Sequence, residues 1–395
     1  MRGLLIKAPT RPMSQLTKQL SQKSALATQR RHLSIDIDRI KADMFSRTHR
    51  VHRDYLQGGK SRLLDNALSD LVPEADQLRY GPRVHKAMED PRYKITPHAP
   101  RALPPGHHLI YFPPAFPGSK LSSDGADQYH SPGVPEFTRR VWASGSLAGL
   151  QTSGLLLGEP AVCLERIIDV SSKGPPGAEK IFVEILREHV SRSEFYRSFD
   201  MWKKELRPRM EILDPNEDAS IVGPTRLTER RTLVFMRSLT EEEKQASLTM
   251  DRKIIRSSML PSYSRTMTPT KNLLFQFSAL SYNAHRIHLD TAYCREVEGY
   301  RTLLVHGPLS LNIMIAVLRS YLAEQGWPGR ADLQRIDYRH LAPLYVDEPF
   351  RVCLRPELRP NSSGAASGSS KWHLWIENAD GGVSVKAEAT TKRVL

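Results

Sequence analysis

The strongest hydrophobic pattern in the chain lies in its last third. From Pro308 to Gln325, apolar residues occupy almost the whole circumference of a helix that has proline in its first turn and Gly326 just past its end. A helix that is apolar on every side has to be buried. Candidate strands follow it, and the last of them alternates apolar and polar positions. The four predicted strands are 333–340, 350–356, 371–378 and 383–391.

A second group of candidate strands occupies the middle of the chain, where short apolar runs are bounded by glycine and proline. The buried helix followed by strands indicates an antiparallel sheet wrapped around that helix, an α+β architecture. The middle group hints at a second, degenerate copy of this unit, because no clear buried helix is visible in it. Its predicted strands are 107–112, 140–147, 161–170, 181–190 and 231–236, and one more is predicted at 273–280.

These patterns divide the 395 residues into units, and that length is sufficient for two or three packed cores. Residues 35–103 are polar with scattered apolar positions and predict a helical or irregular extension. Residues 239–270 predict a helical linker on the surface, and the low-complexity stretch 361–370 predicts a loop. The two sheet-forming halves are 104–238 and 271–395.

The first 34 residues differ in charge from the rest of the chain. They contain seven basic residues and no acidic residue, since the first carboxylate is Asp36, and they have no continuous apolar run. This composition is typical of a mitochondrial transit peptide, and Arg31 to Leu33 just before Ser34 resembles an arginine-marked cleavage site. We therefore expect the mature protein in the mitochondrial matrix. A basic arm that binds nucleic acid or an acidic surface is the alternative.

Composition excludes several classes of protein. Half of the net charge of +14 lies in those 34 residues, and the remaining basic residues are mixed with acids, so dedicated nucleic-acid binding is disfavoured. Cys163, Cys294 and Cys353 are far apart, which argues against a disulfide framework or a zinc module and for a reducing compartment. The sequence has no apolar run long enough for a membrane span and no glycine-rich phosphate loop for a nucleotide cofactor.

The segment just before the buried helix gathers residues that can carry chemistry. Histidine exchanges protons near neutral pH, and a side-chain amide can hold a water or a hydroxyl. A backbone N–H at a helix N-terminus can polarise a carbonyl toward an enolate. This set suits the addition or removal of water next to a carbonyl. Its members are Asn283, His285, Arg286, His288, His306 and Gly307.

The same segment resembles the signature of the MaoC-like (R)-specific enoyl hydratases and 3-hydroxyacyl-thioester dehydratases, which have the hot dog fold. With His288 aligned, the second aspartate of the signature falls on Asp290 and its His-Gly pair on His306 and Gly307. Asn283 stands where the signature has its catalytic aspartate, and His285 and Arg286 replace its Asn-Pro pair. This variant is similar to the fungal mitochondrial dehydratases of type 2 and to mesaconyl-C4-CoA hydratases, as are 107–113 and 139–145.

The resemblance implies a double hot dog chain, with the first half forming the acyl tunnel and the second half supplying the catalytic residues. It implies that His288 acts as general base and acid, that Asn283 positions the C3 hydroxyl, and that the Gly307 N–H binds the thioester oxygen. His285, Arg286 and His306 are expected to contact the substrate. No metal and no redox cofactor are expected.

Each of these residues also has a purely structural interpretation. His288 can be a buried histidine that bonds a backbone carbonyl, and Asn283 can be a turn residue. Gly307 can be a close-packing glycine, and Arg286 a solvated or ion-paired side chain.

The expected activity is dehydration of (3R)-hydroxyacyl groups on acyl carrier protein in mitochondrial type II fatty acid synthesis. One alternative keeps the reaction and takes a CoA ester such as mesaconyl-C4-CoA. Another is a non-catalytic thioester-binding protein, because an amide at position 283 cannot accept a proton as a carboxylate does. The oligomeric state, monomer or homodimer, stays open.

Overall fold

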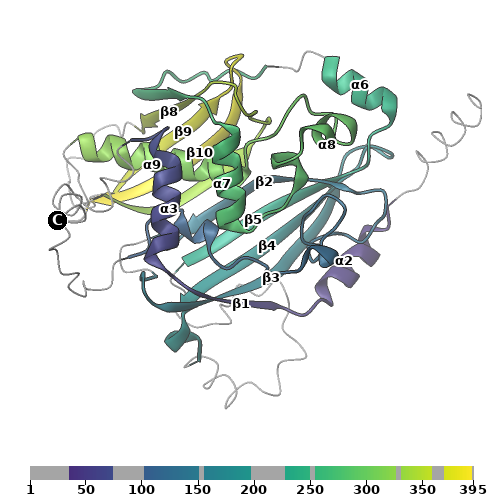
Figure 1. Cartoon of the computed structure of the whole chain (residues 1–395), viewed down its shortest axis with the longest axis horizontal. Coiled ribbons are helices and arrows are strands. Elements are labelled where there is room, and N and C mark those ends of the chain that lie inside the picture. Colours follow the sequence, from purple (N-terminus) through teal and green to yellow (C-terminus); the bar gives the residue numbers. More distant parts are fainter. Residues whose placement is uncertain are drawn as a thin grey trace, which may run out of the picture.

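The computed structural model describes residues 35–73, 102–150, 155–196, 227–249, 254–325, 331–357 and 369–393 (Figure 1). Within these ranges the chain forms a ten-stranded sheet in which every neighbouring pair is antiparallel. The strands are β1 (Arg50–Tyr55), β2 (Arg139–Ala148), β3 (Pro160–Lys173), β4 (Lys180–Ser191), β5 (Leu227–Met236), β6 (Tyr263–Met267), β7 (Ala331–His340), β8 (Phe350–Pro356), β9 (Ser369–Glu377) and β10 (Val383–Arg393). The predicted transit segment and nearly all of the predicted loop 361–370 lie outside the described residues.

The order of the strands repeats across the sheet. It runs β1-β3-β4-β5-β2 and continues β7-β10-β9-β8-β6. Read inward from its own edge, the second half is β6-β8-β9-β10-β7, so each strand has a counterpart at the same place in chain order. Antiparallel pairing of β2 with β7 joins the halves. The strand order thus supports the predicted second copy. That this copy is degenerate stays a prediction, because residues 74–101 of its long connection lie outside the described residues.

The segment predicted as an extension, 35–103, contributes to the sheet and to its cover. After α2 (Ile37–Phe45), which packs on β3, strand β1 forms the edge of the sheet beside β3. Helix α3 (Gly58–Ser69) buries Leu64 and Leu68. The predicted linker 239–270 likewise contains α6 (Glu241–Thr249) and the opposite edge strand, β6.

The strand predicted at 273–280 is wrong, because this segment forms helix α7 (Lys271–Ser281). Its start is capped by Thr270, whose hydroxyl accepts a hydrogen bond from the backbone N–H of Leu273 at 3.2 Å. The buried side chains include Leu273 and Phe277, one helical turn apart. A short apolar run does not by itself distinguish a buried helix from a buried strand.

The strand predicted at 107–112 is also wrong, because the chain forms the 3₁₀ helix η1 (His107–Ile110) there. Gly106 directs the chain into this turn with φ +88°, and an added Cβ would lie 2.3 Å from the side-chain oxygen of Asn312. The run is apolar because it is buried, as Ile110 is completely inaccessible to solvent. Its hydrophobicity therefore reflects burial and not strand pairing.

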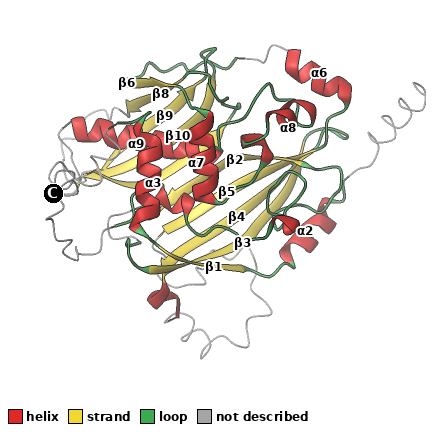
Figure 2. Cartoon of the chain, viewed as in Figure 1, coloured by secondary structure: helices red, strands yellow, loops and turns green. Residues whose placement is uncertain are grey.

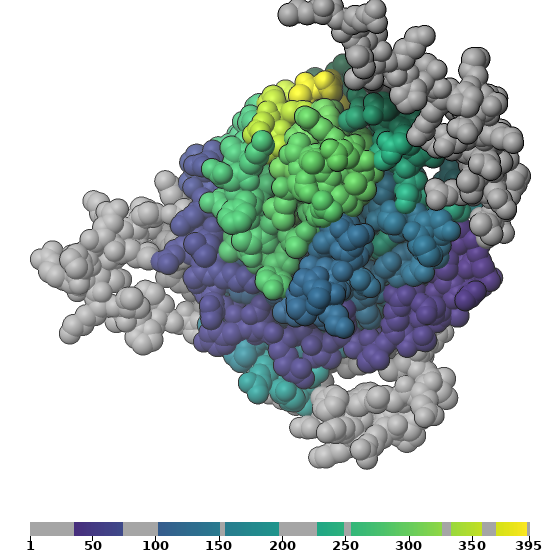
Figure 3. All heavy atoms as spheres, turned by 45° about the vertical axis from the view of Figure 1, so that its right-hand side comes forward, coloured from purple at the N-terminus to yellow at the C-terminus, as the bar shows by residue number. Residues whose placement is uncertain are grey.

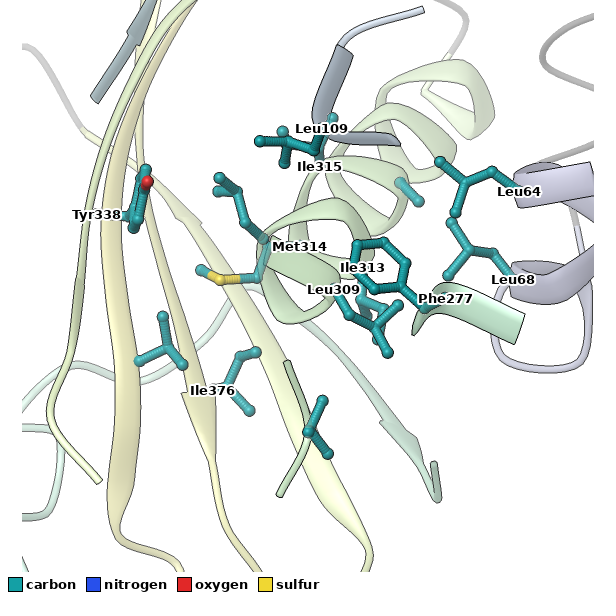
Figure 4. Packing of buried hydrophobic residues seen from close by; sticks show 14 of the residues in the cluster. Leu64, Leu68, Leu109, Phe277, Leu309, Ile313, Met314, Ile315, Tyr338 and Ile376 are labelled. Atoms are coloured by element: carbon teal, nitrogen blue, oxygen red, sulfur yellow. The ribbon is translucent and has the colours of Figure 1, made fainter. Parts of the chain in front are cut away.

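The predicted buried helix is α9 (Gly307–Glu324), and it is covered from two sides. In Figure 4, Met314 points toward Tyr338 and Ile376 of the sheet, whereas Ile313 lies on the side of Phe277. Figure 2 shows α3 and α7 in front of the sheet, where they pack against each other. A helix held between a sheet and two further helices needs no polar face, which explains its apolar circumference. Within the described residues, no helix is long and apolar enough to cross a membrane.

Replacement of Ile313 by alanine tests this central packing. The side chain is fully buried, so Ile313→Ala should lower the free energy of unfolding by about 2–5 kcal/mol through lost burial and a residual cavity. The matched control is Leu63→Ala, because Leu63 lies on α3 with 55% of its surface exposed and should change stability by less than about 0.5 kcal/mol. Chemical denaturation of both variants measures the difference, and equal effects would contradict this packing.

Candidate active site

A cavity of about 890 Å³ lies between the two halves of the chain. The first half contributes wall residues that include Phe112, Arg140 and Trp142, and the second half contributes wall residues that include His288 and Gly307. The sequence motif before the buried helix therefore opens into a space large enough for a small-molecule ligand.

The backbone around Asn283 brings the motif to this cavity. Helix α7 ends at Ser281 and is capped by Tyr282, which adopts the left-handed conformation with φ 53° and so turns the chain away from the helix axis. The side-chain oxygen of Asn283 then accepts a hydrogen bond from the backbone N–H of His285 at 3.1 Å. The amide oxygen is thus engaged within the turn, and the NH₂ group of Asn283 is left to donate a hydrogen bond to a ligand. Asn283 is both the turn residue of the structural interpretation and a residue of the cavity wall.

His288 lies in the short helix η4 (Arg286–His288) and is 7% exposed. Its Nδ1 lies 2.8 Å from the carbonyl oxygen of Leu304 and donates to it, so Nε2 carries the lone pair. Burial, reinforced by neighbouring His285, lowers the pKa of His288 from 6.5 to about 3. The ring is therefore neutral at physiological pH and can accept a proton.

His306 supports the ring of His288 from behind. The two rings stack with their centroids 3.6 Å apart, and His306 Nε2 lies 2.8 Å from the hydroxyl of Ser278. The side chain of His306 is completely buried and does not line the cavity. Its position fixes the orientation of His288 and gives no support to the expected contact with substrate.

Arg286 points away from the cavity. Its guanidinium pairs with Asp290 at 2.7 Å and lies over the ring of Tyr293, and nearly half of its side chain is exposed. Asp290 in turn caps α8 (Thr291–Glu296) by accepting a hydrogen bond from the N–H of Tyr293. Arg286 is therefore the ion-paired surface arginine of the structural interpretation. The position of Arg286 gives no support to the expected substrate contact.

Gly307 combines close packing with an available donor. It is the first residue of α9, and the first helical hydrogen bond runs from the N–H of Ser310 to the carbonyl of His306. The N–H of Gly307 therefore lies outside the intrahelical bonding, at the positive end of the helix dipole. A Cβ at this position would lie 3.2 Å from the Cβ of Trp142 and 3.3 Å from Nε2 of His340. Only glycine fits without displacing its neighbours.

Two residues that the sequence did not single out belong to the site. Asp124, in the loop before β2, places a carboxylate oxygen 3.5 Å from Nε2 of His285. His340, at the end of β7, lines the cavity beside Gly307, and its buried Nε2 has no hydrogen-bond partner among the described residues. His340 was detectable as the last residue of a predicted strand, but Asp124 was not detectable, because its loop is separated from the motif by some 160 residues.

His285 is the second histidine of the cavity wall. Its ring meets that of His288 edge to face, with the centroids 5.6 Å apart. Burial lowers its pKa to about 4, although the carboxylate of Asp124 opposes this shift. Two neutral imidazoles thus meet edge to face in the wall of the cavity that Gly307 also lines. Within the described ranges, no group of three or more potential ligand side chains is arranged to hold a metal ion.

The fold and this site define a class of protein. A solved structure described as a MaoC-like dehydratase covers 89% of this chain and all of its own, at a TM-score of 0.53 and 10% identity. A second MaoC-like dehydratase, from Phytophthora capsici, covers 91% of this chain and 98% of its own, at a TM-score of 0.53 and 12% identity. At these identities the likeness shows the fold alone, and it confirms the predicted hot dog architecture.

The sequence comparison is more specific than the fold. The model of the family hydroxyacyl-thioester dehydratase type 2 matches residues 106–346, more than half of the chain. The chain therefore belongs to this family.

Two relatives represent the two groups that the motif resembles. The chain is 29% identical over 258 residues to the mitochondrial hydroxyacyl-thioester dehydratase type 2 of Schizosaccharomyces pombe, which covers 64% of this chain and 78% of the relative. It is 28% identical over 263 residues to the mesaconyl-C(4)-CoA hydratase of Chloroflexus aurantiacus, which covers 66% of this chain and 78% of the relative. The resemblance stated from the motif is confirmed.

The lowered pKa values of the two cavity histidines make a prediction about titration. His285 and His288 should stay neutral down to about pH 5, because folding lowers the pKa of each from 6.5 to about 4 and about 3. The unfolded chain then binds more protons below pH 6.5, so these groups make the folded state less stable as the pH falls. In an NMR titration of ¹⁵N-labelled histidine, with the two signals assigned by substitution of each residue, the rings of His285 and His288 should not titrate between pH 5.5 and 8. Titration of both near 6.5 would contradict the burial argument.

Proposed function

We propose that this protein is a (3R)-hydroxyacyl-thioester dehydratase that eliminates water reversibly to give the trans-2-enoyl thioester. The observation that carries the proposal is the meeting of three groups at one cavity wall. These are the lone pair on Nε2 of His288, the N–H of Gly307 at a helix N-terminus, and the amide of Asn283. Together they provide a base, an oxyanion donor and a hydroxyl ligand, as elimination next to a carbonyl requires.

The steps follow from these positions. The N–H of Gly307 donates to the thioester oxygen, which makes the C2 hydrogen acidic. His288 Nε2 removes the C2 proton while the NH₂ group of Asn283 donates to the C3 hydroxyl. As the C3–O bond breaks, the imidazolium of His288 delivers the same proton to the departing oxygen, and water leaves. The histidine returns to its neutral form, so no external proton is consumed.

The side-chain amide of Asn283 limits this residue to positioning the substrate. An amide cannot accept a proton at neutral pH, and its oxygen is already bonded to the N–H of His285. The amide can therefore position the hydroxyl, but all proton transfer falls to the histidines. The neutral state of both rings at physiological pH suits this role.

We place the reaction on acyl carrier protein in mitochondrial type II fatty acid synthesis. The family supports this placement, and so does the naming of two fungal relatives as mitochondrial. One is the relative from Schizosaccharomyces pombe. The other is from Saccharomyces cerevisiae; it is 26% identical over 311 residues, and the match covers 77% of this chain and 87% of the relative. The basic, acid-free segment 1–34 agrees with import into the matrix, and the basic chain suits an acidic carrier.

A second candidate keeps the chemistry and changes the substrate to a CoA ester. It is motivated by the relative named mesaconyl-C(4)-CoA hydratase, whose identity to this chain is nearly that of the fungal dehydratase. A non-catalytic thioester-binding protein remains the candidate from a different class, since Asn283 stands where the signature has a carboxylate.

One assay separates the three candidates. The full chain is offered trans-2-enoyl groups in parallel on acyl carrier protein and on CoA, with mesaconyl-CoA as a further substrate, and loss of the enoyl absorbance is followed. We expect hydration, with the carrier-protein thioester turned over more efficiently. Preference for a CoA ester would favour the second candidate, and no turnover by the folded protein would favour the non-catalytic one.

His288→Ala tests the assignment of the base. Removal of the imidazole should lower kcat/KM by about 100-fold or more, as expected for a general acid–base group, with the fold unchanged. The matched control is His373→Ala, because His373 lies on β9, partly exposed beside Glu388 and outside the cavity wall. Retention of more than about a tenth of the activity, less than 1.36 kcal/mol in the barrier, would overturn the role of His288.

A further inference from the structure

We propose that Asp124, from the first half of the chain, is a positioning residue that holds His285 in the tautomer able to accept a hydrogen bond from the C3 hydroxyl of the substrate. The second half would then supply two histidines that contact the substrate, and the first half would supply a carboxylate in a site where Asn283 offers only an amide. This inference rests on the proposed function and assigns a new role within the same site.

The backbone of the loop around Asp124 is fixed on the motif. The carbonyl of Asp124 accepts a hydrogen bond from the N–H of Arg286 at 2.8 Å. The next residue, Gly125, has φ +82°, and a Cβ there would lie 2.1 Å from the carbonyl oxygen of Ala284. Figure 3 shows the blue first-half segment in direct contact with the green second-half segment on this face. The approach is so close that the position of Asp124 relative to His285 is set by main-chain contacts.

The carboxylate of Asp124 is held on every side, and only 2% of the residue is exposed. One oxygen accepts from Nε of Arg140 at 2.8 Å, and the other accepts from the hydroxyl of Ser122 at 2.5 Å and the N–H of Ala126 at 2.9 Å. Burial opposes ionisation, but Arg140, His285 and these hydrogen bonds outweigh it and hold the pKa of Asp124 below its ordinary value. The group facing His285 is therefore a charged carboxylate in one orientation.

The orientation of His285 follows from this carboxylate. Its Nε2 lies 3.5 Å from Asp124 and, among the described residues, has no hydrogen-bond partner that meets the usual geometry. A carboxylate can only accept, so the proton of the neutral ring belongs on Nε2 and the lone pair on Nδ1. Contacts of this kind are often long in a ligand-free site and tighten when substrate binds.

The two motif side chains then complement a hydroxyl group. The C3 hydroxyl has one hydrogen to donate and lone pairs to accept with. The hydroxyl can donate a hydrogen bond to Nδ1 of His285 and accept one from the NH₂ group of Asn283, while Nε2 of His288 removes the proton from C2. Asp124 strengthens the ring of His285 as a hydrogen-bond acceptor that orients the hydroxyl, while the proton that converts the hydroxyl into water comes from His288. The negative charge sits directly behind the ring, where a charged partner has most effect in a buried site.

Asp124→Asn tests the inference. An amide can donate to Nε2 of His285, which would move the ring proton to Nδ1 and abolish the acceptor, as the wrong tautomer does in a Ser-His-Asp triad. We expect kcat for enoyl hydration to fall by about 10-fold to 100-fold, with KM changed by less than about 3-fold. Long-range ¹H–¹⁵N NMR of labelled histidine, assigned with His285→Gln, should show the proton of His285 on Nε2 in the wild type and on Nδ1 in the variant.

Asp127→Asn is the matched control. Asp127 lies in the same loop and is half-buried, but its carboxylate pairs with Arg50. Its replacement can weaken the loop, yet it should leave the tautomer of His285 unchanged. A purely structural role of Asp124 would instead give both variants the same loss of stability and no tautomer change in either.

The outcomes distinguish this inference from the proposed function. A wild type that hydrates enoyl thioesters, together with an Asp124→Asn variant of unchanged kcat and tautomer, would overturn the inference alone. A wild type without turnover would overturn the proposed function, whereas the tautomer measurement would still report on the pair. If Asp124→Asn does not fold, the wild-type spectrum decides, because a proton on Nδ1 of His285 contradicts the inference.

Discussion

The burial of α9 along most of its length is the constraint on which the rest of the structure depends. A helix without a polar face needs cover on all sides, and the sheet, α3 and α7 supply it. The buried stretch begins at Leu309, and the N-terminus just before it lies at the wall of the cavity, which Gly307 and Pro308 line. The donor at Gly307 and the stacked rings of His288 and His306 are therefore products of the same packing that stabilises the core.

Burial also sets the protonation state of the site. Taking an imidazole out of water disfavours its charged form, so the rings of the cavity wall are neutral where exposed histidines would be partly protonated. A neutral ring is useful only if its lone pair faces the ligand. The carbonyl of Leu304 secures this for His288, and we infer that Asp124 secures it for His285. The site thus uses acceptors behind each ring to direct the opposite nitrogen.

The sequence predicted an element correctly where its hydrophobic pattern matched the way the element is buried in the folded protein. The apolar circumference of α9 and the alternation in the strands follow directly from burial, so their positions were predicted correctly. The pattern failed for α7 and η1, because buried apolar runs of eight residues or fewer carry no reliable period. The motif predicted His288 and Gly307 at the cavity. It could not predict Asp124, whose closeness to His285 exists only after the two halves have packed together.

The two similar units are parts of one covalent chain, and the pairing of β2 with β7 joins them into one sheet. In an assembly of identical subunits, every substitution occurs in each copy, and a residue useful in one place must be tolerated in all the others. A fused pair is free of this restriction. The loop of Asp124 can specialise as a partner for the other unit's histidine without placing the same loop anywhere else. Because the two units lie in one polypeptide, the two walls of the cavity can change independently during evolution.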